Sequence, residues 1–180
     1  MKNNKHQFNV CTVCNFNNIN YALTAINSFK KHNRNAKYFI FIVDANRDLI
    51  DYLNQINLYR ISNINFFGPY QLKKSSKIIF TKSSKYFDEM ELCCFGKYIA
   101  IDHILSNKNN PPVCFYLDGD LFFLSNIKSL LKIIKEYAFI LTPHYLNSCE
   151  KIEVEIETLV SGWINAGFFV ANRDSLFFKK

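Results

Sequence analysis

The chain has 180 residues, 49% of them hydrophobic, which is enough for one domain with a substantial core. The 22 Lys and Arg outnumber the 15 Asp and Glu, and the net charge of +7 favours an acidic partner such as a nucleotide diphosphate or an anionic membrane surface. No continuous basic tract interleaved with aromatic residues is present, so we expect no nucleic-acid binding.

The N-terminal residues 1–10 lack the apolar segment of a secretory signal, and no stretch is long enough to span a bilayer. We therefore expect a cytoplasmic protein, either soluble or held at the inner membrane face. Cysteines stay reduced in that compartment, and a single CxxC without a second pair does not predict a zinc site. The cysteines are predicted to be small apolar core residues: Cys11, Cys14, Cys93, Cys94, Cys114 and Cys149.

Apolar runs alternate with amphipathic patterns in the first part of the chain. Residues 8–15 are rich in β-formers, and residues 19–32 place apolar side chains at helical spacing. A second pair follows, with an apolar run at 36–46 and a helical pattern at 47–56, and a short strand is predicted at 63–68. This alternation predicts an α/β, doubly wound, Rossmann-like domain with a mostly parallel sheet flanked by helices.

The rest of the chain continues the alternation after one interruption. Residues 71–85 are polar and without a clean period, which indicates a surface excursion. The elements then predicted are a helix over 88–105, a strand over 113–120 reached through Pro111-Pro112, a helix over 125–137 with Ser125 as its cap, and strands over 138–144 and 162–174. A helix is expected to begin at 174–180, so we expect one domain, 1–180, that lacks a C-terminal portion.

Two acids, Asp118 and Asp120, follow the apolar strand. Ligands of parallel α/β sheets bind beyond the carboxyl ends of the strands, and residues i and i+2 of an extended segment point to one side. Gly119 between them allows the backbone to bend or a ligand to approach. Two neighbouring carboxylates repel unless a divalent cation lies between them, and oxygen ligands suit Mn²⁺ or Mg²⁺. The alternative is an ordinary Asp-Gly turn.

A phosphohydrolase of the haloacid dehalogenase class is a second alternative, with Asp118 as its nucleophile. That class usually carries its aspartate pair on the first strand, followed by a small or hydroxyl residue. Here the pair lies past the middle of the chain and continues with Leu121, Phe122 and Phe123.

Four separated blocks carry a resemblance to a known family, and together they cover most of the chain. The chain resembles GT-A glycosyltransferases, and is similar to glycosyltransferase family 8 and related nucleotide-diphospho-sugar transferases. The blocks are "CTVCNFNNINYALTAINSFKKH" with "FIFIVDAN", "ELCCFGKYI", "YLDGDLFF", and "WINAGFFVANRD" preceded by "LTPH".

The resemblance implies a metal-dependent hexosyltransferase that moves a sugar from a UDP-sugar to a glycan or lipid-linked acceptor. Asp118 and Asp120 would hold Mn²⁺ or Mg²⁺, and Lys97 would bring positive charge to the diphosphate; these three are the implied catalytic residues. Where family 8 enzymes carry an arginine, this chain has Leu92. A histidine from further downstream commonly completes the metal shell in this family, and this sequence has no position that matches it.

The resemblance also implies a set of donor-binding residues and a retaining outcome. The "NAG" tripeptide would lie beneath the donor sugar, and the loop after the first strand would face the base and ribose. A further alternative is a domain that binds the nucleotide sugar without turnover. The implied substrate-binding residues are Thr12, Asn15, Asn17, Asp44, Glu91, Lys97, His144, Asn165, Ala166 and Gly167.

Overall fold

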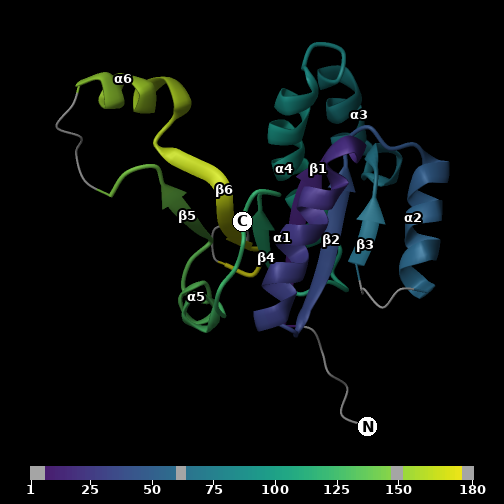
Figure 1. The fold of residues 1–180 in the computed structure, drawn as a ribbon, viewed down its shortest axis with the longest axis horizontal. Coiled ribbons are helices and arrows are strands. Elements are labelled where there is room, and N and C mark those ends of the chain that lie inside the picture. Colours follow the sequence, from purple (N-terminus) through teal and green to yellow (C-terminus); the bar gives the residue numbers. More distant parts are fainter. Residues whose placement is uncertain (1–6, 60–63, 147–151, 176–180) are drawn as a thin grey trace, which may run out of the picture.

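The structure is a computed structural model that describes residues 7–59, 64–146 and 152–175. Its centre is a six-stranded sheet in the order β3-β2-β1-β4-β6-β5 (Figure 1). The strands are β1 (Phe8–Cys14), β2 (Ala36–Ile42), β3 (Ile64–Phe67), β4 (Val113–Leu117), β5 (Phe139–Pro143) and β6 (Ile164–Asn172). The helices are α1 (Ile19–His32), α2 (Arg47–Tyr59), α3 (Lys74–Ser83), α4 (Glu89–Ser106), α5 (Lys128–Ile133) and α6 (Ile152–Ser161), with short 3-10 turns η1 (Phe16–Asn18) and η2 (Pro69–Gln71).

The sheet is mixed, as the sequence predicts for a mostly parallel α/β domain. Strands β3, β2, β1 and β4 are parallel, whereas β6 runs antiparallel to both β4 and β5. Every residue of β1 is buried, which explains its continuous apolar run, because a central parallel strand is covered on both faces. The carboxyl ends of β1 and β4 therefore meet at one edge of the sheet.

Two apolar clusters fill the two faces of the sheet. Ile26 and Phe29 of α1 belong to the first cluster with Ile50 of α2. Phe80 of α3 and Ile104 of α4 belong to the second. Helices α1 and α2 thus cover one face, and α3 and α4 cover the other.

Helix α4 lies close against the sheet at Gly96. A Cβ atom at this position would lie 3.1 to 3.3 Å from side-chain atoms of Val13, Val43 and Phe41. The next residue of the helix, Lys97, is consequently held near the carboxyl end of the central strands.

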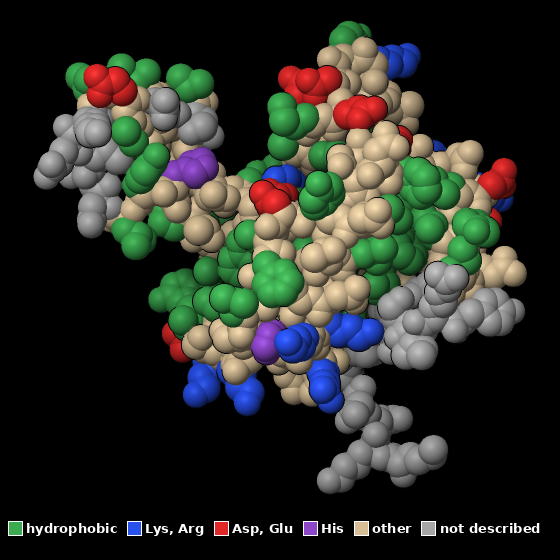
Figure 2. All heavy atoms as spheres, viewed as in Figure 1, with side chains coloured by type: hydrophobic (Ala, Val, Ile, Leu, Met, Phe, Trp, Pro, Cys, Tyr) green, Lys and Arg blue, Asp and Glu red, His purple; other side chains and the backbone are tan. Residues whose placement is uncertain are grey.

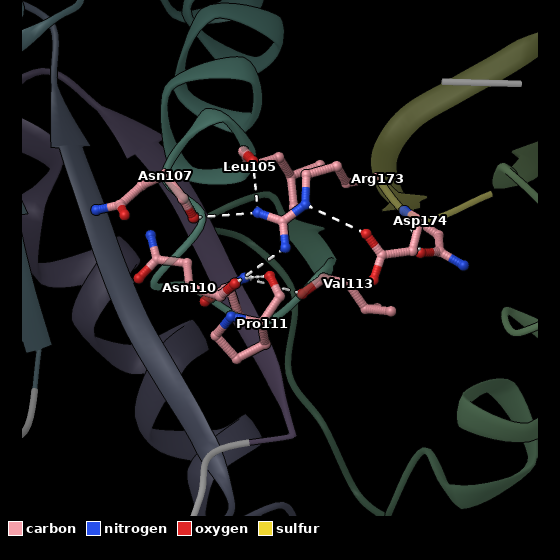
Figure 3. Close-up of polar contacts among 9 residues, drawn as sticks. Leu105, Asn107, Asn110, Pro111, Val113, Arg173 and Asp174 are labelled. Atoms are coloured by element: carbon pink, nitrogen blue, oxygen red, sulfur yellow. Dashed lines mark hydrogen bonds and ion pairs between the residues drawn. The ribbon is translucent and has the colours of Figure 1, made fainter. Parts of the chain in front are cut away.

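Arg173, at the end of β6, joins three parts of the chain (Figure 3). Its guanidinium donates hydrogen bonds to the backbone carbonyls of Leu105 at 2.8 Å, Asn107 at 3.1 Å and Asn110 at 3.3 Å. These carbonyls belong to the end of α4 and the loop after it. The "NRD" part of the last sequence block therefore has a structural role, because it fixes β6 relative to α4.

The start of β4 is held in a similar way. The buried side-chain amide of Asn9 in β1 donates to the carbonyls of Pro111 at 2.8 Å and Val113 at 3.0 Å. Together with Arg173, these hydrogen bonds join β1, β4, β6 and α4 at the end of the sheet where β1 and β4 begin.

Three expectations from the sequence need correction. Residues 71–85 are not a surface excursion: they contain α3, whose Phe80 is buried and whose Ser76 hydroxyl donates to Asp102 at 3.0 Å. The helix expected over 125–137 is only α5, with Ile127 rather than Ser125 at its N-cap. The structure also adds α6, in a stretch where the sequence pattern predicts no element.

The cysteines divide into two groups. Cys11, Cys14 and Cys114 are buried and free, as expected for core residues. Cys93 is half-buried and Cys94 is exposed, so the core prediction is wrong for Cys94. Cys149 lies outside the described residues, as does most of the helix expected at 174–180. In the described part of the chain, no helix combines the length and apolarity needed to cross a bilayer.

Candidate functional site

A cavity of about 580 Å³ lies at the carboxyl ends of β1 and β4, between them and the first turns of α1 and α4. Four of the residues singled out from the sequence line it together: Asn15, Lys97, Asp118 and Asp120. Other lining residues are Val13, Cys14, Asn18, Tyr21, Glu89, Met90, Cys93, Cys94, Tyr116 and Gly119.

Asp118 is held by two side chains. The Nζ atom of Lys97 lies 2.9 Å from each of its carboxylate oxygens, and the Tyr116 hydroxyl donates to Oδ1 at 2.6 Å. Lys97 is only 8% exposed, so its ammonium depends on this carboxylate for charge compensation. Tyr116 is fully buried and stacks on Phe169 with ring centroids 5.0 Å apart.

Strand geometry brings Tyr116 and Asp118 together. Residues two apart at the end of a strand project to the same side of the sheet, so the phenol lies beside the carboxylate. Burial and the neighbouring Asp118 carboxylate raise the pKa of Tyr116 well above its ordinary value, which keeps the phenol protonated and donating. Tyr116 was not among the residues predicted from the sequence, although it lies two residues before Asp118.

The neighbouring strand β6 leaves room for this arrangement. The backbone N–H of Asp118 donates to the carbonyl of Gly167 at 2.8 Å. A Cβ atom at position 167 would lie 3.2 Å from Oδ2 of Asp118 and 2.9 Å from Oδ1 of Asn165, which accepts from the Gly167 N–H at 2.8 Å. Ala166 presents its carbonyl 3.5 Å from Lys97 Nζ. The "NAG" tripeptide is thus adjacent to the Lys97–Asp118 pair.

Asp120 lines the cavity, but the backbone conformation that places it there differs from the predicted one. Residues 118–120 form a turn, not an extended segment, and the N–H of Leu121 donates to the Asp118 carbonyl at 3.2 Å. Gly119 lies against the first turn of α1, where a Cβ atom would be 3.3 Å from the Ala22 nitrogen. Asp120 is exposed and still lines the same cavity as Asp118.

Glu89 and Asn15 form the opposite wall. The Asn15 side-chain amide donates to Glu89 Oε2 at 2.6 Å, and its oxygen accepts from the N–H of Asn18 at 3.1 Å. Glu91, the acid predicted from the resemblance, lies outside the lining. Glu91 caps α4, because its carboxylate accepts from the Asp88 N–H at 2.9 Å.

Four further predicted residues lie outside the cavity lining. Thr12 is fully buried within β1, which leaves it no surface for a ligand, and Asn17 is exposed on η1. Asp44 accepts from the Phe16 N–H at 2.9 Å and so anchors the loop after β1. The His144 ring lies 2.6 Å from the Gly162 carbonyl, at the end of β5.

Two thiols make part of the wall apolar. Burial, together with the neighbouring Cys93 and Asp44, raises the pKa of Cys14 to about 12. Burial and Cys94 raise the pKa of Cys93 to about 11. Both groups are therefore uncharged thiols at neutral pH, and this part of the wall carries no charge.

The two acids carry the type of donor atom that a hard divalent cation takes. Asp118 and Asp120 supply only oxygen donors, which Mn²⁺ and Mg²⁺ accept, and phosphate oxygens and water commonly complete such shells. Within residues 7–59, 64–146 and 152–175, no group of three or more His, Cys, Asp and Glu could hold a metal ion. A cation held by Asp118 and Asp120 would therefore need its other ligands from water or from a bound molecule.

No protein-family model matches the chain, and no curated protein matches it in sequence. Solved structures do match. The glycosyltransferase GlyE of Streptococcus pneumoniae TIGR4 aligns with a TM-score of 0.55 at 17% identity, over 93% of this chain and 34% of that one. The chain has a glycosyltransferase fold. It is GT-A-like, with helices on both faces of a mostly parallel sheet.

Two eukaryotic structures share this glycosyltransferase fold. Mouse xyloside xylosyltransferase 1 in its apo form aligns with a TM-score of 0.56 at 12% identity, over 95% of this chain and 70% of that one. The mannosyltransferase Ktr4p of S. cerevisiae aligns with a TM-score of 0.52 at 9% identity, over 95% and 57%. The chain spans about a third of the length of GlyE. At these identities the likeness establishes the fold, and the sugars in these names belong to those proteins.

Proposed function

We propose that the chain is the donor-binding domain of a metal-dependent glycosyltransferase of the family 8 type. It takes a hexosyl group from a nucleotide diphosphate, a UDP-sugar, and passes it with retention to a glycan or lipid-linked acceptor. The observation that carries the proposal is that Asp118 and Asp120 line one cavity with Lys97 at the carboxyl ends of β1 and β4.

The chemistry of the reaction suits these groups. Cleavage of the bond between sugar and diphosphate places negative charge on the leaving phosphate. A cation bound by Asp118 and Asp120 would stabilise that charge as a Lewis acid, without a proton donor. The ammonium of Lys97 lies 2.9 Å from the Asp118 carboxylate, and its positive charge would also stabilise the negative charge of the leaving phosphate.

The remaining wall residues would position the donor. The thiols and the Asn15–Glu89 pair lie at the end of β1, where the base and ribose are expected. Gly167 has no side chain where a Cβ atom would lie 3.2 Å from Asp118 Oδ2, and we expect the donor sugar to lie beside this backbone. A cytoplasmic location belongs to this proposal, and cell fractionation tests it.

The phosphohydrolase alternative has less support. The acid pair follows β4 and not the first strand, where that class usually carries its nucleophile. The pair is also followed by Leu121, Phe122 and Phe123 rather than by a small or hydroxyl residue. Release of phosphate from simple phosphomonoesters, lost in Asp118→Asn, would support that alternative.

Thermal unfolding with UDP and Mn²⁺ tests the proposal. UDP at a hundred times its Kd is expected to stabilise the protein by about 2.7 kcal/mol, only when Mn²⁺ is present. Asp120→Ala should abolish this stabilisation. Asp51→Ala, which removes an exposed acid on α2, is the matched control and should keep it. Stabilisation by UDP without metal, equal in both variants, would contradict the proposal.

Turnover distinguishes an enzyme from a domain that only binds. Incubation with UDP-sugars and Mn²⁺ should release UDP, by hydrolysis or by transfer to an added sugar. Binding without any release of UDP would assign this form as a nucleotide-sugar-binding domain.

A further inference from the structure

The positive charge of the chain is unevenly distributed. Two segments, residues 19–35 and 121–136, together contain six Lys and Arg and a single acid, Glu136. They therefore account for five of the seven excess positive charges of the chain. The first segment contains α1 and the residues after it, and the second leads from the candidate site through α5.

The two segments pack against each other. The Phe123 N–H donates to the Ser28 hydroxyl at 3.1 Å, and the Ile127 N–H donates to Asn33 Oδ1 at 3.0 Å. The rings of Phe29 and Phe123 meet edge to face with centroids 4.8 Å apart. Figure 2 shows Lys and Arg side chains gathered along the lower edge, where α1 and α5 lie in Figure 1. We name this surface the basic face; it consists of Lys30, Lys31, Arg34, Lys128, Lys132 and Lys135.

Helix α3 is also rich in lysine, but its charge is balanced. The neighbouring α4 and its cap bring four acids to the same part of the molecule, and Lys73 pairs with Asp102 at 2.6 Å. Those acids are Asp88, Glu89, Glu91 and Asp102. Helix α1 has no acid, and the only acid of the second segment is its last residue. The basic face, with six cations and one acid in its two segments, has no such balance.

Apolar side chains protrude beside these cations. Leu121 and Phe123 pack against the core, whereas the alternate residues Phe122 and Leu124 are 66% and 81% exposed. Ile133 is also exposed, at the end of α5. Basic residues flanked by exposed apolar ones are typical of surfaces that lie in a membrane interface. Of these three side chains only Phe122 could stack on a base, and a nucleic acid would gain little from the aliphatic Leu124 and Ile133.

We propose that the basic face, with Phe122 and Leu124, binds the surface of an anionic lipid membrane. The lysines and Arg34 meet the lipid phosphates, and the two apolar side chains enter the headgroup boundary. Helix α1 begins beside Gly119 at the cavity, and its last turn carries Lys30 and Lys31, so these cations lie at the end of the sheet away from the cavity. Residues 121–124 lead from Asp120 toward them. This inference does not depend on the transferase reaction.

Co-sedimentation with vesicles tests the inference. The whole chain should bind vesicles that contain phosphatidylglycerol, should not bind vesicles of phosphatidylcholine alone, and should be released by salt. The variant Lys31→Gln/Lys128→Gln/Lys132→Gln should lose about fivefold in affinity per lysine, or about a hundredfold in all. The control Lys74→Gln/Lys82→Gln/Lys85→Gln removes the same charge from exposed positions of α3 and the residues after it, and should lose far less.

A second pair of variants separates lipid from other anionic partners. Phe122→Ser/Leu124→Ser should weaken vesicle binding, whereas Ile78→Ser/Ile79→Ser, on exposed positions of α3, should not. Equal losses in the two lysine variants would overturn the inference, as would failure to bind either vesicle. Binding of a single-stranded oligonucleotide that anionic vesicles do not displace would assign the face to nucleic acid instead.

Discussion

Lys97 Nζ lies 2.9 Å from both carboxylate oxygens of Asp118, and the two side chains are 10% and 30% exposed. The pair joins α4 to the end of β4 at the wall of the cavity. A lysine so little exposed requires its partner, and the carboxylate is placed by the lysine. The site is thus built into the packing of the domain before any ligand binds.

Removal of this lysine should destabilise the fold. Lys97→Met leaves Asp118 without its charge partner, and the loss should fall at or below the low end of the about 3–5 kcal/mol found for fully buried pairs, because Asp118 is partly solvated. Chemical denaturation measures the change. The double variant Lys97→Met/Asp118→Asn should recover part of the loss. If the double variant loses more stability than the two single variants lose together, the ion pair is not the cause of the loss.

The Tyr116 hydroxyl should act by orienting Asp118. Tyr116→Phe keeps the stack on Phe169 but removes the 2.6 Å hydrogen bond, so metal-dependent UDP affinity should fall by about tenfold or more. Calorimetric titration measures it. Tyr98→Phe is the matched control, since Tyr98 also stacks on Phe169, at 5.9 Å, and is exposed. Equal losses in the two variants would assign Tyr116 a packing role only.

Two glycines should respond differently to alanine. Gly167→Ala places a methyl group 3.2 Å from Asp118 Oδ2, so UDP affinity should fall by more than tenfold. Gly162→Ala meets no neighbouring atom, but its φ of +92° is a left-handed conformation that strains alanine. Gly162→Ala should therefore lower the melting temperature with unchanged UDP affinity. Unchanged UDP affinity in Gly167→Ala, with a loss of affinity in Gly162→Ala, would show that Asp118 does not need the space at residue 167.

The free energy of unfolding should decrease in mild acid because His103 becomes protonated. Burial is the main cause that lowers the pKa of His103 below its ordinary value near 6.5, and its ring stacks on Phe67 at 5.1 Å. The folded state therefore prefers the neutral ring. Its contribution is complete above pH 6.5 and is lost as the pH falls through the lowered pKa. Denaturation at several pH values should show a shallower fall for His103→Gln than for the wild type, whereas a parallel curve would exclude His103.

Most of the sheet could be predicted from the sequence because its central strands are buried on both faces. Such strands read as continuous apolar runs, and β1, β2 and β4 were placed correctly. Helix α3 was missed because its buried face is narrow: Phe80 is its one buried large side chain, among lysines and serines. The sequence predicted an extended segment at residues 118–120, where the structure has a turn. So few residues after a strand show no periodicity that could distinguish the two.

Part of the candidate site could also be predicted, since Asp118, Asp120 and Lys97 line one cavity. Glu89, the acid on the opposite wall, could not be predicted. Glu91 was preferred to Glu89, although Asp88 and Glu91 form a capping box that is visible in the sequence. Which acid faces a cavity depends on the rotation of α4, and that rotation is set by the contact of Gly96 with the sheet.

Asp118 and Asp120 should bind a divalent cation together with a pyrophosphate. Electron paramagnetic resonance of Mn²⁺ can measure this, because bound Mn²⁺ loses the sharp signal of the free ion. The signal of free Mn²⁺ should fall when protein and UDP are both present, and Asp120→Asn should prevent this fall while Asp51→Asn does not. If UDP and protein leave the signal unchanged, or if it falls equally in both variants, the two acids do not hold the cation.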